Sequence, residues 1–200
     1  TGCQTRPSQP QALYEAKQAV INWHDSGAYE AAVSVTIAKA EKLLNQTLPG
    51  STRPAMVLDV DDTAITTWAY QRKSDFGYST CDLKTFQEAA TAPAIAPVLA
   101  LYRHALARGV TVFFITGRRE TLRSATEANL RFAGYEGYAK LFCKPTDWKA
   151  DNAKFKTGIR QALQDEGYDL ILNLGDQESD LVGGLARHGI RLPNPYYLSK

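Results

Sequence analysis

Short apolar runs alternate along this chain with amphipathic segments that end at glycine, and this alternation constrains the fold most. The apolar runs, rich in β-branched and aromatic residues, cover residues 55–60, 110–115, 137–143, 168–174 and 189–192. The segments between them have apolar residues at helical spacing and cover residues 97–108, 120–132, 153–166 and 178–187. Strands that alternate with helices form a parallel sheet covered by helices. We therefore predict an α/β fold with a Rossmann-like, doubly wound parallel sheet.

Two segments lie outside this alternation. Residues 11–50 precede the first predicted strand, and their apolar spacing predicts an N-terminal helical segment with helices over 11–23 and 29–44. The core domain is expected over residues 51–200, interrupted at about 64–95 by a segment without a clear strand. The aromatic residues of that segment are Trp68, Tyr70, Phe76, Tyr78 and Phe86. An insertion directly after the first strand would lie over the ends of the strands, so we predict a small cap.

The bulk composition fits one globular domain. The chain has 200 residues, 44% hydrophobic and 22% charged, which is enough for a continuous core. Its net charge of +2, without a dense block of Lys and Arg, argues against a nucleic-acid polymer as partner. We expect Arg118 and Arg119 to lie on a solvated helix face. No apolar run approaches the roughly 20 residues of a membrane span.

The sequence begins Thr1-Gly2-Cys3. Small residues before a Cys resemble the end of a bacterial lipoprotein signal, where cleavage leaves the Cys as the lipidated first residue. Residues 1–10 then form a flexible tether, and Cys3 attaches it to a membrane. This predicts an extracytoplasmic protein, in the periplasm or at the outer membrane, where Cys81 and Cys143 could form a disulfide. The alternative is that the sequence begins near a Cys by chance.

Carboxylates gather at the end of the first predicted strand, in the order Asp59, Asp61 and Asp62, before Thr63. In a parallel α/β sheet, ligands bind at the carboxyl ends of the strands. The run therefore predicts negative charge where a cation and a reacting group can meet. Crowded carboxylates repel one another, and a divalent cation is the usual remedy. For this run alone, an acidic turn without a ligand is the alternative.

Polar residues follow the later strands in an order that extends such a site. Thr116-Gly117 follows the second strand, where a hydroxyl and backbone N–H groups can hold an anion. Lys156 lies early in a later helix, and Asp176 and Asp180 follow the next long strand. Singly, the Thr and the two Asp are also typical of helix caps, and the Lys of a surface. Their joint order indicates a site.

This order resembles the haloacid dehalogenase (HAD) superfamily of phosphohydrolases. The family pattern has an Asp-x-Asp-x-Thr strand end, a Ser or Thr strand end, a Lys, and a Gly-Asp-x-x-x-Asp strand end. The finer features Phe114-Ile115-Thr116-Gly117-Arg118 and Leu192-Pro193-Asn194-Pro195-Tyr196-Tyr197 resemble the acid phosphatases of subfamily IIIB. That branch includes class B and class C acid phosphatases and plant vegetative storage proteins. The resemblance covers about residues 53–197.

The resemblance implies a Mg²⁺-dependent acid phosphatase that hydrolyses phosphomonoesters. Asp59 would be the nucleophile that forms a phosphoaspartyl intermediate. Asp61 would act as general acid and then as general base, which predicts an acidic rate optimum. Mg²⁺ would be held by Asp59, by the main-chain carbonyl of Asp61 and by Asp176.

The remaining roles also follow from the resemblance. Thr116, the Gly117 N–H and Lys156 would hold the phosphoryl oxygens. Asp180 would orient either the water ligands of the metal or Lys156. Asp62 would serve the backbone or a cap, without a part in catalysis.

The cap would select the leaving group. Trp68 and Tyr70 are candidates for stacking on a nucleobase or aryl ester, which suits nucleoside monophosphates, unless these rings form the core of the cap. Two other functions stay open: a phosphotransferase with the same intermediate, and a non-catalytic surface binding or storage lipoprotein. The presence of both Asp59 and Asp61 argues against the second.

Overall fold

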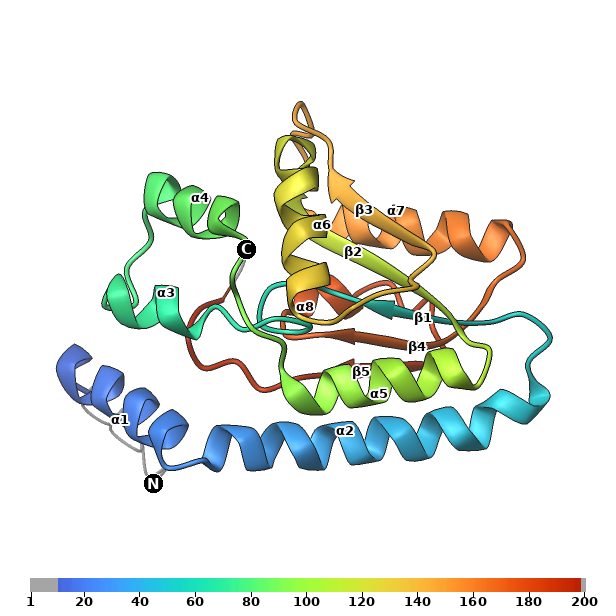
Figure 1. Cartoon of the computed structure of the whole chain (residues 1–200), viewed down its shortest axis with the longest axis horizontal. Helices are drawn as coiled ribbons and strands as arrows, with labels where there is room; N and C mark the ends of the chain where they lie inside the picture. The colour runs from blue at the N-terminus through green and yellow to red at the C-terminus, as the bar shows by residue number, and fades with distance from the viewer. Residues whose placement is uncertain (1–10, 199–200) are drawn as a thin grey trace, which may run out of the picture.

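The computed structural model describes residues 11–198, so Cys3 and the predicted tether over residues 1–10 lie outside the described part of the chain. Within it, one sheet contains the strands β1 (Pro54–Leu58), β2 (Thr111–Arg119), β3 (Lys140–Lys144), β4 (Asp169–Gly175) and β5 (His188–Arg191). The strand order is β3-β2-β1-β4-β5, and all neighbours are parallel. The predicted α/β class with a doubly wound parallel sheet is confirmed (Figure 1).

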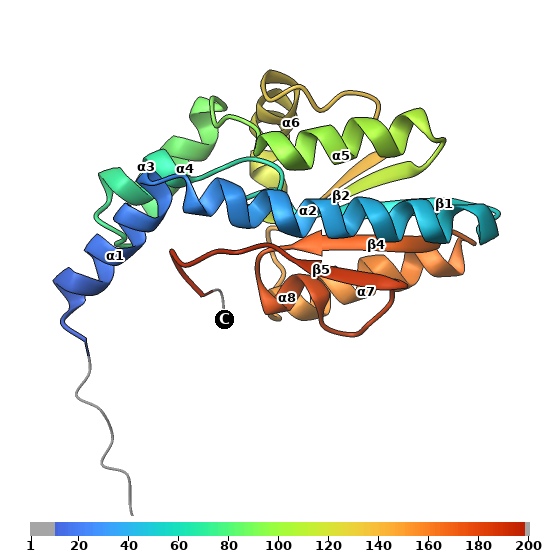
Figure 2. The same cartoon turned by 90° about the horizontal axis from the view of Figure 1, so that it is seen from below.

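Helices cover both faces of the sheet (Figure 1, Figure 2). One face is covered by α2 (Ala28–Thr47), α5 (Ala96–Ala107) and α6 (Arg123–Phe132). The other is covered by α7 (Asn152–Asp165), with α8 (Glu178–Leu181) beside it. The helix α1 (Leu13–Asp25) precedes α2. The short 3-10 helices η1 (Leu48–Gly50) and η2 (Glu120–Leu122) follow α2 and β2.

The central strand β1 serves two hydrophobic cores. Met56 and Leu58 pack into the larger core with α2 and α5, whereas Ala55 and Val57 pack with Phe155 of α7. Successive side chains of a strand point to opposite faces of the sheet. A strand buried on both faces must therefore be apolar throughout, which is why the strands are continuous apolar runs rather than alternating ones.

The N-terminal helical segment belongs to the same core as the sheet. The inward face of α2 is formed by residues three or four positions apart, all buried: Tyr29, Val33, Ile37, Ala40 and Leu44. Each large apolar side chain buried in this way stabilises the fold by roughly 1.5–3 kcal/mol. In contrast, α1 has no buried residue and projects away from the sheet (Figure 2).

The insertion after β1 contains α3 (Trp68–Lys73) and α4 (Thr80–Ala89), which lie beyond the sheet (Figure 1). Isolated bridges join Ile65 to Asp61 and to Ala94, so the two ends of the insertion meet beside the end of β1. The Ser79 side chain caps α4 by accepting a hydrogen bond from the Asp82 N–H. The segment therefore has helices of its own and a narrow connection to the core.

The two largest differences from the predicted boundaries are at the end of β2 and at the end of α8. β2 continues to Arg119 rather than ending at residue 115, and its register with β3 shifts between Thr116 and Arg119. Thr116-Gly117 thus lies in an irregular strand end instead of a strand-to-helix turn. The helix predicted over 178–187 ends at Leu181, because Gly183 and Gly184 follow with φ of 91° and 74°, which no helix accommodates.

The disulfide that Cys81 and Cys143 could have formed is not present. Cys81 is an exposed free thiol on α4, and Cys143 is a buried free thiol on β3. One lies in the insertion and the other inside the sheet, so their positions depend on packing that the sequence pattern does not reveal. None of the helices within residues 11–198 combines the length and the apolarity needed to cross a membrane.

Candidate active site

The ends of β1 and β4 bring the first carboxylates together. Leu58 pairs in register with Leu174, and the Asp59 N–H donates to the Leu174 carbonyl at 3.0 Å. Asp59 therefore lies beside Gly175, the last residue of β4, and Asp176 is the next residue along the chain. Carboxylate oxygens of Asp59, Asp176 and Asp180 all lie within 4.8 Å of one another, and the three side chains are buried.

Burial and mutual repulsion raise the pKa values of Asp59 and Asp176. Loss of solvent raises the pKa of Asp59 well above its usual range, although the nearby Lys156 ammonium acts in the opposite direction. Burial and the Asp180 carboxylate raise the pKa of Asp176 to about 6. Asp59 and Asp176 therefore take up protons more readily than exposed carboxylates do.

Lys156 reaches the cluster from the first turns of α7. Its Nζ donates to Asp59 Oδ1 and to Asp180 Oδ1, each at 2.5 Å, and the residue is only 5% exposed. The two carboxylates raise the pKa of Lys156 even though burial lowers it. The contact with Asp180 is the one expected of a residue that orients Lys156. One ammonium against three carboxylates leaves negative charge, and an all-oxygen donor set suits a hard divalent cation such as Mg²⁺.

Neighbouring polar groups orient Asp176. Its Oδ2 accepts hydrogen bonds from Asn194 Nδ2 at 2.6 Å and from the Gln177 side-chain amide, and its Oδ1 accepts from Thr63 Oγ1 at 3.2 Å. Donors on the outer side of a carboxylate fix its direction and are typical around metal ligands. The Asn of the C-terminal Pro-Asn-Pro segment thus supports the site directly.

Asp180 is fixed through its backbone as well as its side chain. Its Oδ2 accepts from the Gln177 N–H at 2.9 Å, and its carbonyl accepts from Arg160 Nη1 at 2.6 Å and Asn173 Nδ2 at 2.8 Å. A Cβ on Gly175 would lie 2.2 Å from the Asp180 Cβ, so only glycine fits there. Sequence reasoning missed Arg160 and Asn173, because both act through a main-chain carbonyl.

Asp61 is turned toward β2 and forms a bidentate ion pair with Arg118. Arg118 Nε lies 2.8 Å from Asp61 Oδ2, and Nη2 lies 2.6 Å from Oδ1. Arg118 is only 4% exposed, so the prediction that it lies on a solvated helix face was wrong. Residues two apart on a strand share a face. Arg118 lies two positions after Thr116, and this spacing could have indicated that its side chain points toward the site. The side chains gathered as metal donors are accordingly Asp59, Asp176 and Asp180, without that of Asp61.

Asp62 has the geometry of a cap. It is fully buried with φ of 54°, and its carboxylate accepts from the Thr67 N–H at 2.8 Å and from the Thr67 hydroxyl. It thereby holds the residue that precedes α3. Burial, with the charge of Asp176, raises the pKa of Asp62 to about 7.

Thr116 is buried at the end of β2, and its Oγ1 accepts from the Arg118 N–H at 3.1 Å. Gly117 lies against the side chain of Asn152, because a Cβ on this glycine would be 3.3 Å from Asn152 Nδ2. The predicted anion-binding residues are therefore packed between the Asp61 ion pair and the start of α7.

The two candidate stacking residues have different surroundings. Trp68 stacks on His24 of α1, with ring centroids 3.7 Å apart and an interplanar angle of 10°. Tyr70 is 5% exposed, packs against Phe86, and accepts a hydrogen bond from the Ser79 N–H at 3.3 Å. This environment favours the alternative that Tyr70 belongs to the core of the cap.

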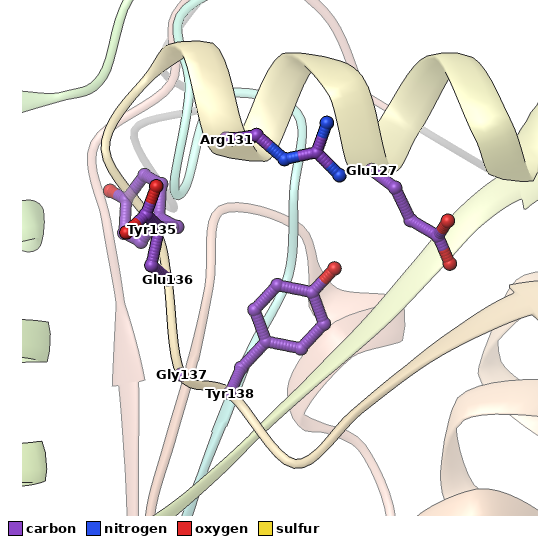
Figure 3. A pocket seen from close by; sticks show the side chains of 6 residues that line it. All are labelled: Glu127, Arg131, Tyr135, Glu136, Gly137 and Tyr138. Atoms are coloured by element: carbon purple, nitrogen blue, oxygen red, sulfur yellow. The ribbon is translucent and has the colours of Figure 1, made fainter.

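A cavity of about 380 Å³ lies elsewhere, between α6 and the segment that leads to β3 (Figure 3). Its lining residues are Glu127, Arg131, Tyr135, Glu136, Gly137 and Tyr138. None of them is a predicted site residue. The candidate site is thus defined by the residues at the strand ends and not by this cavity.

Two curated plant proteins are similar to this chain. Acid phosphatase 1 of Solanum lycopersicum is 36% identical over 150 residues, which are 72% of this chain and 59% of that protein. The stem 28 kDa glycoprotein of Glycine max is 33% identical over 152 residues, 72% of this chain and 60% of that protein. The chain thus spans about three-fifths of the length of these curated relatives.

A solved structure shares the fold. The class C acid phosphatase from Bacillus anthracis superposes with a TM-score of 0.78 at 23% identity, covering 92% of this chain and 85% of that chain. The profile of the HAD superfamily, subfamily IIIB (acid phosphatase), matches residues 8–200. The predicted family is confirmed: this chain belongs to the HAD superfamily, subfamily IIIB, the acid phosphatases.

Proposed function

We propose that this protein is a Mg²⁺-dependent acid phosphatase that hydrolyses phosphomonoesters through a phosphoaspartyl intermediate on Asp59. The observation that carries the proposal is the buried cluster of Asp59, Asp176 and Asp180 around Lys156, at the carboxyl edge of the sheet. Membership of an acid phosphatase subfamily supports it.

Two half-reactions follow from this assignment. The Asp59 carboxylate attacks phosphorus, and the bond from phosphorus to the leaving oxygen breaks while Asp61 gives that oxygen a proton. Asp61 then removes a proton from water, which attacks the phosphoaspartate and releases phosphate. Thr116, the Gly117 N–H and Lys156 bind the phosphoryl oxygens. The second half-reaction returns both carboxyl groups to their starting states.

The ion pair with Arg118 shapes what Asp61 can do. Both Asp61 oxygens accept hydrogen bonds from the guanidinium, so one oxygen must leave the pair to exchange a proton with substrate or water. The other oxygen can stay on Arg118. Arg118 would then keep the carboxyl group aimed at the reacting phosphate and act as a positioning residue.

The residues fit a divalent cation. Asp59 and Asp176 would hold Mg²⁺, with the main-chain carbonyl of Asp61, and Asp180 lies next to both side chains. When bound, Mg²⁺ supplies positive charge that reduces the repulsion between an attacking carboxylate and an anionic phosphoester. Lys156, which extends from α7, would contribute a second positive charge beside the metal.

The first test is hydrolysis of p-nitrophenyl phosphate at about pH 5–6, near the second pKa of a phosphate ester. We expect the wild-type protein to hydrolyse the ester with Mg²⁺, to lose this activity with EDTA and to recover it when the metal is added back. The Asp59→Asn variant should show no hydrolysis. An inert wild-type protein with every divalent metal would contradict the proposal. It would favour a storage role, the function that the name of another relative states: vegetative storage protein 1 of Arabidopsis thaliana, 29% identical over 156 residues.

We also propose an extracytoplasmic location through lipidation of Cys3, supported by the Thr1-Gly2-Cys3 motif. Labelled palmitate should enter the protein in cells that express the full gene, and the Cys3→Ser variant should stay unlabelled. Equal labelling of both would contradict it. For the substrate, nucleoside monophosphates are our first candidates, because Trp68 is only half-buried and lies in an aromatic group with His24 and Tyr196. A panel of nucleoside monophosphates and alkyl phosphates tests this.

A further inference from the structure

Two cations face each other where β2 and β3 end. Arg119 and Lys144 are register partners on these neighbouring parallel strands. Like charges placed directly opposite each other on a sheet are destabilising. Neither residue forms an ion pair with a carboxylate anywhere in residues 11–198. The charges that act on Lys144 come from Arg119 and Lys156 and, together with burial, lower its pKa.

Both side chains are held by neutral oxygens. Arg119 Nη1 donates to the carbonyls of Pro145, Thr146 and Trp148 at 3.0, 3.2 and 3.1 Å. Lys144 Nζ donates to Asn152 Oδ1 at 2.5 Å. These contacts fix the positions of the two cations but leave their charges uncompensated. A fixed, half-buried cation without an anion is suited to an anionic ligand from outside.

The pair lies beside the predicted phosphoryl site. The Asn152 side chain, which holds Lys144, lies against Gly117, as its 3.3 Å distance from a Cβ on that glycine shows. Asn152 also opens α7, and Lys156 of the same helix reaches Asp59 one turn later. Gly117, Asn152 and Lys144 therefore form a row that leads from the phosphoryl site toward the end of β3.

We propose that Lys144 and the Asn152 carboxamide, with Arg119 behind them, form a subsite for a second anionic group of the substrate. The inference rests on the proposed phosphatase function and specifies its substrate class. It favours phosphomonoesters whose leaving group carries another phosphate a few bonds from the ester. The ammonium and the amide would bind that second group while the first is transferred.

The test compares n-propyl phosphate with the terminal bisphosphates of ethane-, propane- and butanediol, at constant free Mg²⁺. We expect kcat/KM for one bisphosphate to exceed that for propyl phosphate by about tenfold or more, since a charged hydrogen bond contributes at least that factor. The value for each bisphosphate is first divided by two, because it carries two equivalent ester groups. The preference should be greatest at one chain length and should weaken with salt.

The variants separate a binding role from a structural one. Lys144→Met should lower kcat/KM for the favoured bisphosphate about tenfold more than that for propyl phosphate, mainly through KM, and Lys144→Arg should retain part of the preference. Lys154→Met is the matched control, because Lys154 is an exposed lysine near the start of the same helix, and it should change neither value.

Three outcomes would overturn the subsite. They are no bisphosphate preference in the wild type at any length, a preference that survives in Lys144→Met, and an equal loss for both substrates in that variant. Failure of the proposed function is distinguishable, because wild-type protein would then hydrolyse neither propyl phosphate nor p-nitrophenyl phosphate.

Discussion

The carboxyl edge of the sheet has two halves that carry opposite charges and differ in their hydrogen-bond partners. Where β1 and β4 end, Asp59, Asp176 and Asp180 are buried and supplied with protein donors. Where β2 and β3 end, Arg119 and Lys144 bond neutral oxygens and face each other. The acidic half presents fixed oxygens for a cation, and the basic half retains charge for an anion. A phosphoester with its metal would lie between them.

Apart from loss of the nucleophile in Asp59→Asn, the largest effect on activity is expected for Asp61→Asn, which removes the proposed proton donor between the two halves. We expect kcat for an alkyl phosphate to fall about 10²- to 10⁴-fold, the usual contribution of a general acid or base. p-Nitrophenol needs little protonation to leave, so p-nitrophenyl phosphate should still give a burst of one equivalent followed by slow turnover. Rapid-quench and stopped-flow measurements test this. Equal losses for both substrates without a burst would remove the acid–base role.

The acidic half should make the metal-free protein more stable at mildly acidic pH. The pKa of Asp62 is raised from 3.8 unfolded to about 7 folded, so the native state binds more protons between these values. Stability is therefore highest at low pH and falls as pH rises toward 7. The full effect is on the order of 4 kcal/mol or less.

Urea denaturation in EDTA at pH 5 and pH 8 measures this dependence. The raised pKa values of Asp59 and Asp176 act in the same direction. Asp62→Asn should reduce the difference between the two pH values, because an amide does not titrate. A variant with the full wild-type difference would show that Asp62 is not a source of it.

Mg²⁺ should stabilise the acidic half by binding only the folded state. At a concentration one hundred times its Kd, the expected gain is about 2.7 kcal/mol, seen as a higher Tm. Asp176→Asn should lose most of this shift, because it replaces a charged carboxylate, which Asn194 and Thr63 hold in place, by a neutral amide. Asp82→Asn, at an exposed position on α4, is the control and should keep the shift. A Tm that does not respond to Mg²⁺ in the wild type would contradict a metal site.

The sequence pattern predicted the acidic half better than the basic one. Asp59 and Asp176 lie at the ends of apolar runs, and parallel strands bring such positions to one edge regardless of packing detail. The helix predicted over 178–187 was too long because the helical spacing of apolar residues continues past Leu181, whereas the backbone turns at Gly183 and Gly184.

The missed residues depend on partners far away in the chain. Arg118 is buried because Asp61 lies opposite it, 57 positions earlier, and the same arginine without that carboxylate would be expected in solvent. Arg160 binds a main-chain carbonyl 20 positions away, which no side-chain motif records. Likewise, whether Cys81 and Cys143 meet depends on how the cap packs on the sheet. Local patterns locate strand ends, but tertiary packing determines which charges are paired.

The ion pair between Arg118 and Asp61 directly links the two halves. Replacing Arg118 should lower activity less than Asp61→Asn does. Arg118→Lys should lower kcat roughly 10- to 100-fold, because lysine cannot hold both Asp61 oxygens in one plane. KM should change less, since the phosphoryl ligands remain. In the background of Asp61→Asn, the same substitution should cost much less, because residues that act through one interaction are not additive. Steady-state kinetics of both single variants and the double variant measure this coupling. If the two losses simply multiply, Arg118 acts on the substrate independently of Asp61, and the halves meet only through the phosphoester.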